Sequence, residues 1–246
     1  MSDRHTLKKN AKILCTTAKP SLITAGLIYA VLILIVSALS SKLIGSGITE
    51  RDAEKFMNAY YEGNMEAAVN LIPRFQPKTG ALAIDTLLRL LVVVVAAGFV
   101  IFVLNSIRRT EPTYANLLDG FSIPWKVLFN YLLKGILVSV GSLLLVVPGV
   151  ILFYAYRQSL YLLIDHPEMT VIQSLRESRQ MMKGHKWELF MMDLSFLGWH
   201  ILGLIIPLAD VFVYPYTQTT YALYYEELHG ACLEIPEFPF DPDRFE

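Results

Sequence analysis

The residues from Ser21 to Leu39 read SLITAGLIYAVLILIVSAL and include no charged side chain. An α-helix needs about 20 predominantly apolar residues to cross the hydrocarbon core of a bilayer. The run is longer than the apolar region of a cleavable signal peptide, which is about 7–15 residues, so we expect it to be retained. Of the whole chain, 54% is hydrophobic and 17% charged, whereas soluble domains are about 25% charged. The run therefore predicts a membrane-spanning helix.

Five further apolar segments follow along the chain. With the first, they occupy residues 21–39, 81–104, 125–147, 150–164, 187–206 and 211–228. Pro148 and Gly149 are expected to turn the third segment into the fourth as a tight hairpin, because proline cannot continue a hydrogen-bonded helix. Pro207 separates the fifth and sixth segments in the same way. The pattern predicts an all-α fold: a polytopic membrane helix bundle with six transmembrane helices and amphipathic interfacial helices.

The distribution of basic residues predicts the orientation. Short cytoplasmic loops carry an excess of lysine and arginine. Basic residues gather before the first segment, after the second and after the fourth, whereas the turns at Pro148 and Pro207 have none. We therefore expect both termini in the cytoplasm and the loop 40–80 outside. The chain then has three parts: a basic interfacial segment (1–20), a membrane domain (21–228), and an acidic cytoplasmic tail (229–246) that is expected to be disordered.

Amphipathic patterns are found on both sides of the predicted membrane. In the outer loop, one helix is expected from Thr49 to Gly63 and a second over residues 65–72. They form either a cap on the bundle or a site for a partner or ligand. The N-terminal segment places apolar side chains on one face with lysines around them, which is typical of a helix in the interface. That apolar face consists of Leu7, Ala11, Leu14 and Ala18.

A further amphipathic helix is expected between the fourth and fifth segments. Thr170 and Gln173 have the spacing of a capping box, and apolar residues such as Val171 and Leu175 then share a face. Basic residues near anionic lipid contribute about 1 kcal/mol each. They serve orientation alone, or they form a specific lipid or partner site. The predicted headgroup-binding residues are Arg176, Arg179, Lys183 and Lys186.

Two charged residues lie inside predicted spans at similar depth. Asp193 is roughly 9 Å beyond Trp187, where the fifth segment enters the membrane, at 1.5 Å per residue. Arg157 is roughly 12 Å from Asp165, at the inner end of the fourth segment, on the same scale. A charge at membrane depth is costly and usually paired or functional, so we expect Arg157 and Asp193 to pair. A transport or proton role and snorkelling to the interface are the alternatives.

A second polar group is expected toward the outer side. Asp85 and Arg89 are four residues apart on one helical face and are expected to pair with each other. His200 is expected to be a hydrogen-bonded interior group that joins them or Asp210 in an outer polar cluster.

The sequence contains no recognisable catalytic or metal-binding pattern. The motifs HExxH, GxSxG and Walker A are missing, as are paired carboxylates within the spans. Cys15 and Cys232 have no CxxC pattern and no histidine at ligand spacing, so both are expected to be reduced thiols. The formal net charge of -1 gives no indication of a nucleic-acid partner. We therefore expect no catalytic residue, no metal and no cofactor.

Several motifs together resemble a known family. They are LLDGF (117–121), VPGVILFYAY (147–156), DHP (165–167), MMKGHKWELF (181–190), LSFLGW (194–199), PY (215–216) and YYEEL (224–228). They resemble a bacterial family of six-helix integral membrane proteins of unknown function. More distantly, they are similar to the membrane domain of some glycerophosphodiester phosphodiesterases. The resemblance implies the six-span fold and a location in the bacterial cell membrane, and it implies no activity.

Two functions are compatible with these features. One is a non-enzymatic membrane scaffold or accessory protein that engages lipids or protein partners. The other is a small-solute or lipid transporter with a polar path around Arg157 and Asp193. Transporters often contain internal repeats, and none is evident here, which favours the scaffold. The expected partners are the bilayer, anionic lipids at the inner face, and a membrane protein or a second copy of the chain.

Overall fold

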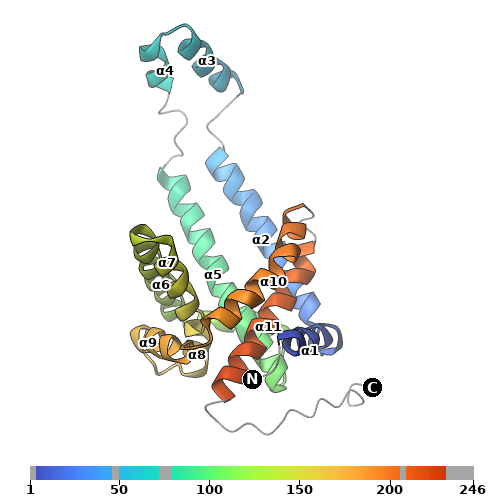
Figure 1. The fold of residues 1–246 in the computed structure, drawn as a ribbon. Coiled ribbons are helices and arrows are strands. Elements are labelled where there is room, and N and C mark those ends of the chain that lie inside the picture. The colour runs from blue at the N-terminus through green and yellow to red at the C-terminus, as the bar shows by residue number, and fades with distance from the viewer. Residues whose placement is uncertain (1–3, 46–49, 72–78, 206–208, 231–246) are drawn as a thin grey trace. The chain divides into compact units, whose positions relative to one another are not determined.

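The structure is a computed structural model that describes residues 4–45, 50–71, 79–205 and 209–230 (Figure 1). Every regular element in these ranges is a helix, and no strand occurs among them, which confirms the all-α class. The elements are α1 (Arg4–Thr17), α2 (Leu22–Gly45), α3 (Glu50–Tyr61), α4 (Met65–Leu71), α5 (Thr79–Arg108), the 3-10 helix η2 (Tyr114–Ser122), α6 (Pro124–Leu144), α7 (Val146–Ala155), α8 (Ser159–Asp165), α9 (Val171–Met181), α10 (Lys186–Ile205) and α11 (Asp210–Gly230).

The chain divides into two compact units. The first is formed by Met1–Ala30 together with Val93–Glu246, and the second by Val31–Val92. Helices α2 and α5 contribute residues to both units. The predicted outer loop 40–80 falls within the second unit, and the predicted division into three parts stays a prediction.

Four helical segments in the described part of the chain are long and apolar enough to cross a membrane. They are Leu22–Leu43, Gly80–Arg108, Pro124–Leu144 and Val146–Asp165. They correspond to the first four predicted spans and indicate a membrane protein. Helices α10 and α11 do not belong to this set, so the count of six spans stays a prediction.

Exposed apolar side chains gather where α6 ends and α7 begins. Leu143, Leu144, Leu145, Val146 and Val147 are between 67% and 89% exposed. Soluble monomers rarely expose a contiguous apolar patch of this kind, whereas lipid-facing helices do. The hairpin tip therefore has the surface expected of a segment immersed in lipid.

The hairpin between α6 and α7 turns earlier than predicted. Leu145 has an extended backbone, with φ -162° and ψ 144°, and separates the two helices. Pro148 lies in the first turn of α7, where a missing N–H removes no helical hydrogen bond. Gly149 has a packing role, because a Cβ atom there would lie 2.0 Å from Oγ of Ser142 on α6. The Pro-Gly pair thus permits close packing of α7 on α6 and does not form the turn itself.

The 3-10 helix η2 packs on α5 backbone against backbone. A Cβ atom on Gly120 of η2 would lie 2.1 Å from the carbonyl oxygen of Val94. A Cβ atom on Gly98 of α5 would lie 2.0 Å from the carbonyl oxygen of Leu117. Only glycine fits at both positions, which gives the LLDGF motif a structural reason.

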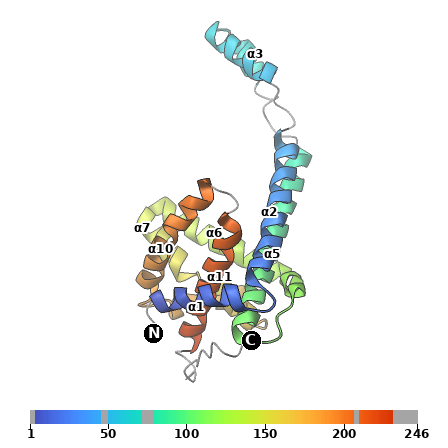
Figure 2. The same ribbon diagram turned by 90° about the vertical axis from the view of Figure 1, so that its right-hand side faces the viewer.

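Helix α1 lies across α11 in the first unit (Figure 2). It buries Leu7 and Ala11, as the pattern predicted, and Cys15 in place of Leu14, which is half-buried. The Cys15 thiol donates a hydrogen bond to Oγ1 of Thr219 at 3.7 Å. Burial raises the pKa of Cys15 to about 11, so this thiol stays protonated at neutral pH. Packing on α11 thus accounts for the apolar stripe of α1.

The second unit contains the two short helices predicted in the outer loop. Helices α3 and α4 are separated by Gly63, whose φ of 72° suits glycine. Oδ1 of Asn64 accepts a hydrogen bond from the Ala67 N–H at 3.1 Å and caps α4. These helices confirm the secondary structure predicted for this segment.

Candidate functional site

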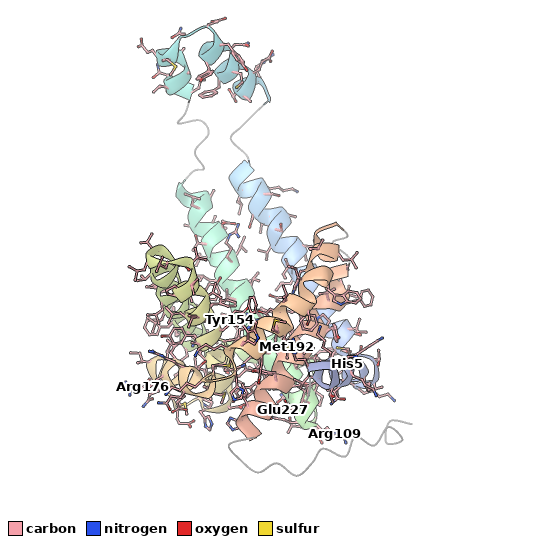
Figure 3. The ribbon with its side chains drawn as sticks, viewed as in Figure 1. His5, Arg109, Tyr154, Arg176, Met192 and Glu227 are labelled. Atoms are coloured by element: carbon pink, nitrogen blue, oxygen red, sulfur yellow. The ribbon has the colours of Figure 1, made fainter. Side chains whose placement is uncertain are left out.

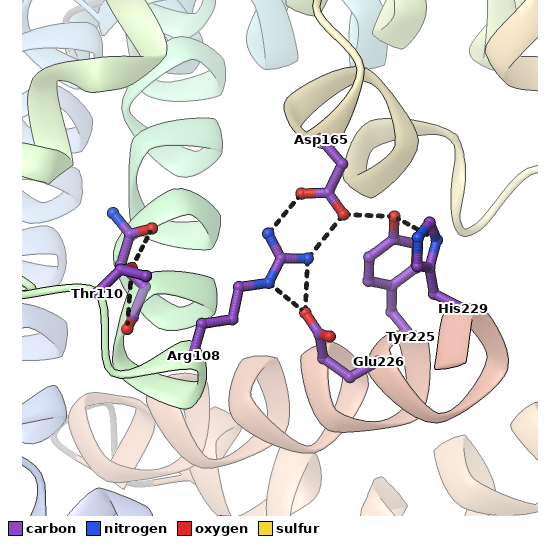
Figure 4. Close-up of polar contacts among 7 residues, drawn as sticks. Arg108, Thr110, Asp165, Tyr225, Glu226 and His229 are labelled. Carbon is purple, nitrogen blue, oxygen red and sulfur yellow. Dashed lines mark hydrogen bonds and ion pairs between the residues drawn. The ribbon is translucent and has the colours of Figure 1, made fainter. Parts of the chain in front are cut away.

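Three helices of the first unit are tied together by Arg108, the last residue of α5 (Figure 4). Its two terminal nitrogens donate to the two carboxylate oxygens of Asp165 on α8, both at 2.7 Å. Its Nε donates to Oε1 of Glu226 on α11 at 2.7 Å. The Tyr225 hydroxyl also donates to Asp165, at 2.7 Å. We call Arg108, Asp165, Tyr225 and Glu226 the Arg108 network.

The Arg108 network is largely shielded from solvent. The side chains of Arg108, Asp165 and Glu226 are 33%, 10% and 21% exposed. A two-pronged contact between guanidinium and carboxylate is strong and geometrically specific. The network therefore fixes the ends of α5, α8 and α11 against one another, which is a structural role.

The fourth predicted span is interrupted. Helix α7 ends at Ala155 and α8 begins at Ser159. The prediction of one continuous helix over 150–164 is therefore wrong. Residues Tyr156, Arg157 and Gln158 form the turn between them. We call these three residues the α7–α8 break. Non-helical backbone at membrane depth is tolerated only where protein or a water-filled cavity covers it.

Helix α9 supplies part of the cover for the break. Oγ of Ser178 accepts from the Gln158 N–H at 3.2 Å and donates to the Ala155 carbonyl at 2.9 Å. Oγ of Ser159 donates to the Tyr156 carbonyl at 2.9 Å. The full burial of Ser178 on α9 is thus explained by the backbone of the break that it satisfies.

The predicted pair of Arg157 and Asp193 lies around this break, but the two side chains form no ion pair within 4.0 Å. The carboxylate of Asp193 accepts from the Tyr154 hydroxyl at 2.9 Å and from the Tyr221 hydroxyl at 2.5 Å. The guanidinium of Arg157 lies over the Tyr221 ring, 4.6 Å from its centre, and near the ring of Phe153 at 5.3 Å. Tyr221 therefore connects the two charges, because its ring faces the cation and its hydroxyl the anion.

Of the predicted headgroup-binding residues, Arg176 and Arg179 lie on the exposed side of α9, Lys183 in the turn after it and Lys186 at the start of α10. Arg176, Arg179 and Lys183 are exposed and Lys186 is half-buried, and Arg176 is seen at the periphery in Figure 3. The predicted capping box is present, with the Gln173 N–H donating to Oγ1 of Thr170 at 3.3 Å. The buried face is the predicted one, from Val171 through Met182. The amphipathic helix expected here is confirmed.

The predicted outer polar cluster is found only in part. Arg89 and Asp85 pair at 2.8 Å within the second unit, as expected. His200 belongs to the first unit, where it is exposed, so it is not an interior group as predicted. Asp210 is the first residue of α11, and its side chain lies outside the described residues.

No candidate metal site is found in the described part of the chain. No group of three or more His, Cys, Asp or Glu side chains there could hold a metal ion. Cys232 and the remainder of the predicted acidic tail from residue 231 lie outside the described residues.

One family model matches the chain, over residues 137–231. Its description is "Protein of unknown function (DUF975)". The match runs from within α6 to the end of α11 and so includes the α7–α8 break, α9, Asp165 and Glu226. No curated protein and no solved structure matches. The resemblance to a family of unknown function is thereby supported, and the chain is a membrane protein whose biochemical activity is unknown.

The sequence interpretation missed two features of the first unit. One is the Arg108 network, although a cation that ends one span and carboxylates that end two others are a signal for pairing. Lys134 was not considered, although it is a lone charge in the apolar segment YLLKGILV. It lies at the midpoint of α6.

Proposed function

We propose that the chain is a non-enzymatic scaffold or accessory protein of the bacterial cell membrane that engages anionic lipid at the cytoplasmic face. The observation that carries the proposal is the construction of α1 and α9. Each buries one face against the first unit and leaves basic side chains exposed. Both helices lie at the same end of this unit (Figure 1). Because the apolar faces of both helices are packed on the protein, attraction between the exposed basic side chains and anionic headgroups is the interaction that supports membrane binding.

The six-span topology is part of this proposal, with α10 and α11 as the fifth and sixth spans. Its support is that helix ends alternate as six crossings require. The Arg108 network joins the ends of α5, α8 and α11. Nζ of Lys126, in the first turn of α6, donates to the carbonyls of Pro167 and Met169, just after α8. Cytoplasmic termini then follow from the basic residues gathered at this end.

The distant kinship with the membrane domain of glycerophosphodiester phosphodiesterases is likewise a proposal. It rests only on the motifs quoted from the sequence, and a solved structure of such a domain would test it by superposition. The partner of the scaffold is proposed to be a membrane protein or a second copy of the chain.

Lipid retention tests the proposed function. The full chain is purified in mild detergent with mixed lipid, and the retained phosphatidylglycerol is measured at low and at high salt. We expect retention to fall in Arg176→Gln/Arg179→Gln, and to fall with salt in the unmodified chain, because exposed charges are screened. The matched control is Arg51→Gln/Lys55→Gln on α3, which also removes two exposed charges. Equal retention in both variants would contradict the proposal.

A transporter is the second candidate, and the α7–α8 break favours it. Interrupted membrane helices line the substrate sites of many transporters. The break includes Arg157, whose guanidinium lies over the Tyr221 ring. Uptake of a labelled solute or lipid by vesicles containing the purified chain distinguishes this candidate from a scaffold.

A further inference from the structure

The 3-10 helix η2 carries three rows of side chains, because residues three apart in a 3-10 helix lie above one another. The first row faces α5. Leu117 and Gly120 are buried in this row, and the ring of Tyr114 stacks on that of Phe102, with the two ring centres 5.9 Å apart. This row therefore holds η2 on the first unit.

The second row is polar, and its hydrogen bonds are made locally. Nδ2 of Asn116 donates to Oδ2 of Asp119 at 2.6 Å, and Oγ of Ser122 donates to the Asp119 carbonyl at 2.7 Å. The Thr113 N–H donates to Oδ1 of Asn116 at 2.7 Å at the start of the helix. These hydrogen bonds are made without any other element of the chain.

The third row of η2 is apolar and exposed. Leu118 is 63% exposed and Phe121 is 44% exposed. Exposed apolar side chains continue into α6 at Trp125, Phe129 and Leu132, which lie on one face of that helix. Helix α6 is one of the four segments that can cross a membrane. The exposed row thus leads along the chain into a surface that faces lipid.

The length of α6 gives the depth of η2 in the membrane. The 21 residues of α6 extend about 30 Å at 1.5 Å each, which matches the thickness of the hydrocarbon core. Pro124, the first residue of α6, therefore lies at the membrane boundary, and η2 ends just before it. Nζ of Lys126 donates to the carbonyls of Pro167 and Met169, whereas Trp125 is 81% exposed. Tryptophan is enriched at membrane–water interfaces, so its position agrees with this depth.

The geometry points to insertion of the exposed row of η2 into the leaflet at the start of α6, with Leu118, Phe121 and Trp125 at the boundary between headgroups and acyl chains. The partner is the acyl part of the leaflet, because the row has no charged member and leads into the exposed apolar side of α6. Amphipathic helices bind in this way when their apolar face is free. Helices α1 and α9 differ, since their apolar faces are packed on the protein. The inference goes beyond the proposed function, because insertion of η2 needs neither anionic lipid nor basic side chains.

Quenching of tryptophan fluorescence by brominated lipid tests the insertion. The chain has three tryptophans, so Trp187→Phe/Trp199→Phe leaves Trp125 as the only reporter. The full chain is placed in phosphatidylcholine nanodiscs, whose two faces are open to the buffer, with bromine near the headgroup or near the chain ends of the lipid. We expect stronger quenching by the first lipid than by the second, and little quenching by iodide in the buffer. No anionic lipid is present, so the result does not depend on the proposed function.

Reporters on η2 itself are placed in a chain in which Trp125 is also replaced by phenylalanine. Leu118→Trp and Phe121→Trp each put a tryptophan in the exposed row, and two reporters keep the test valid if one disturbs folding. Ser122→Trp puts one in the polar row and is the matched control. Lipid brominated near the headgroup should quench both reporters of the exposed row as it quenches Trp125, whereas iodide should quench Ser122→Trp more strongly than either.

Three results would overturn the insertion. Quenching of the Leu118→Trp and Phe121→Trp reporters by iodide would place the exposed row in water. Shielding of both from lipid and from iodide would mean that a second copy of the chain or another protein covers the row. Lipid quenching of Ser122→Trp equal to that of the other two would mean that the rows do not determine which side of η2 faces lipid.

Discussion

The hydroxyl of Tyr221 lies 2.5 Å from a carboxylate oxygen of Asp193. The guanidinium of Arg157 lies over the face of the same tyrosine ring. A cation over an aromatic face is attracted by the ring quadrupole, more strongly when solvent is excluded. Tyr221 thus joins two opposite charges that do not touch each other.

Removing the Tyr221 hydroxyl tests this connection. Tyr221→Phe keeps the ring under Arg157 and removes one donor from Asp193. We expect it to lower the free energy of unfolding by about 1.5–3 kcal/mol, the range for hydrogen bonds to charged groups. The matched control is Tyr216→Phe on the same helix, because the Tyr216 hydroxyl makes no hydrogen bond to a described residue. Thermal unfolding in detergent measures both, and equal melting temperatures would contradict the connection.

Breaking the Arg108 network should be more damaging. Arg108→Gln leaves Asp165 and Glu226 close together without the cation that they share. We expect a loss of about 3 kcal/mol, at the low end for a broken buried ion pair because a third of Arg108 is exposed. Arg108→Gln/Glu226→Gln should recover part of the loss, since one of the two carboxylates is gone. Arg179→Gln, an exposed arginine on α9, should melt like the unmodified chain. If the double variant is no more stable than Arg108→Gln, repulsion is not the cause.

The backbone contact between η2 and α5 predicts a strong effect of a single methyl group. Gly120→Ala should destabilise the first unit, because its Cβ atom would meet the Val94 carbonyl. Gly135→Ala is the control: nothing lies within 4 Å of a Cβ atom there, and alanine favours a helix interior by about 0.5–1 kcal/mol. Unfolding of the two variants in detergent should shift in opposite directions. A Gly120→Ala protein as stable as Gly135→Ala would show that the contact is not tight.

Hydrophobic length and helical periodicity predicted much of this fold. The first four spans, α3, α4 and α9 follow directly from apolar runs and capping residues. The α7–α8 break could not be read in this way, because its backbone is satisfied by Ser178 from a helix that is remote in the sequence. The distance of Arg157 and of Asp193 from the inner ends of their spans predicted that the two residues lie at similar depth. It could not show that Tyr221 lies between them, since that depends on the rotation of α11.

The most direct test of the account is the sidedness of its basic helices. Single cysteines are placed at Glu62, after α3, and at Glu177 on α9, in chains that lack Cys15 and Cys232. Both positions are exposed. In intact cells, an impermeant thiol reagent should label the cysteine at position 62, and it should label the one at position 177 only after the membrane is opened. Labelling of position 177 in intact cells would place α9 outside and contradict a protein that engages anionic lipid at the cytoplasmic face.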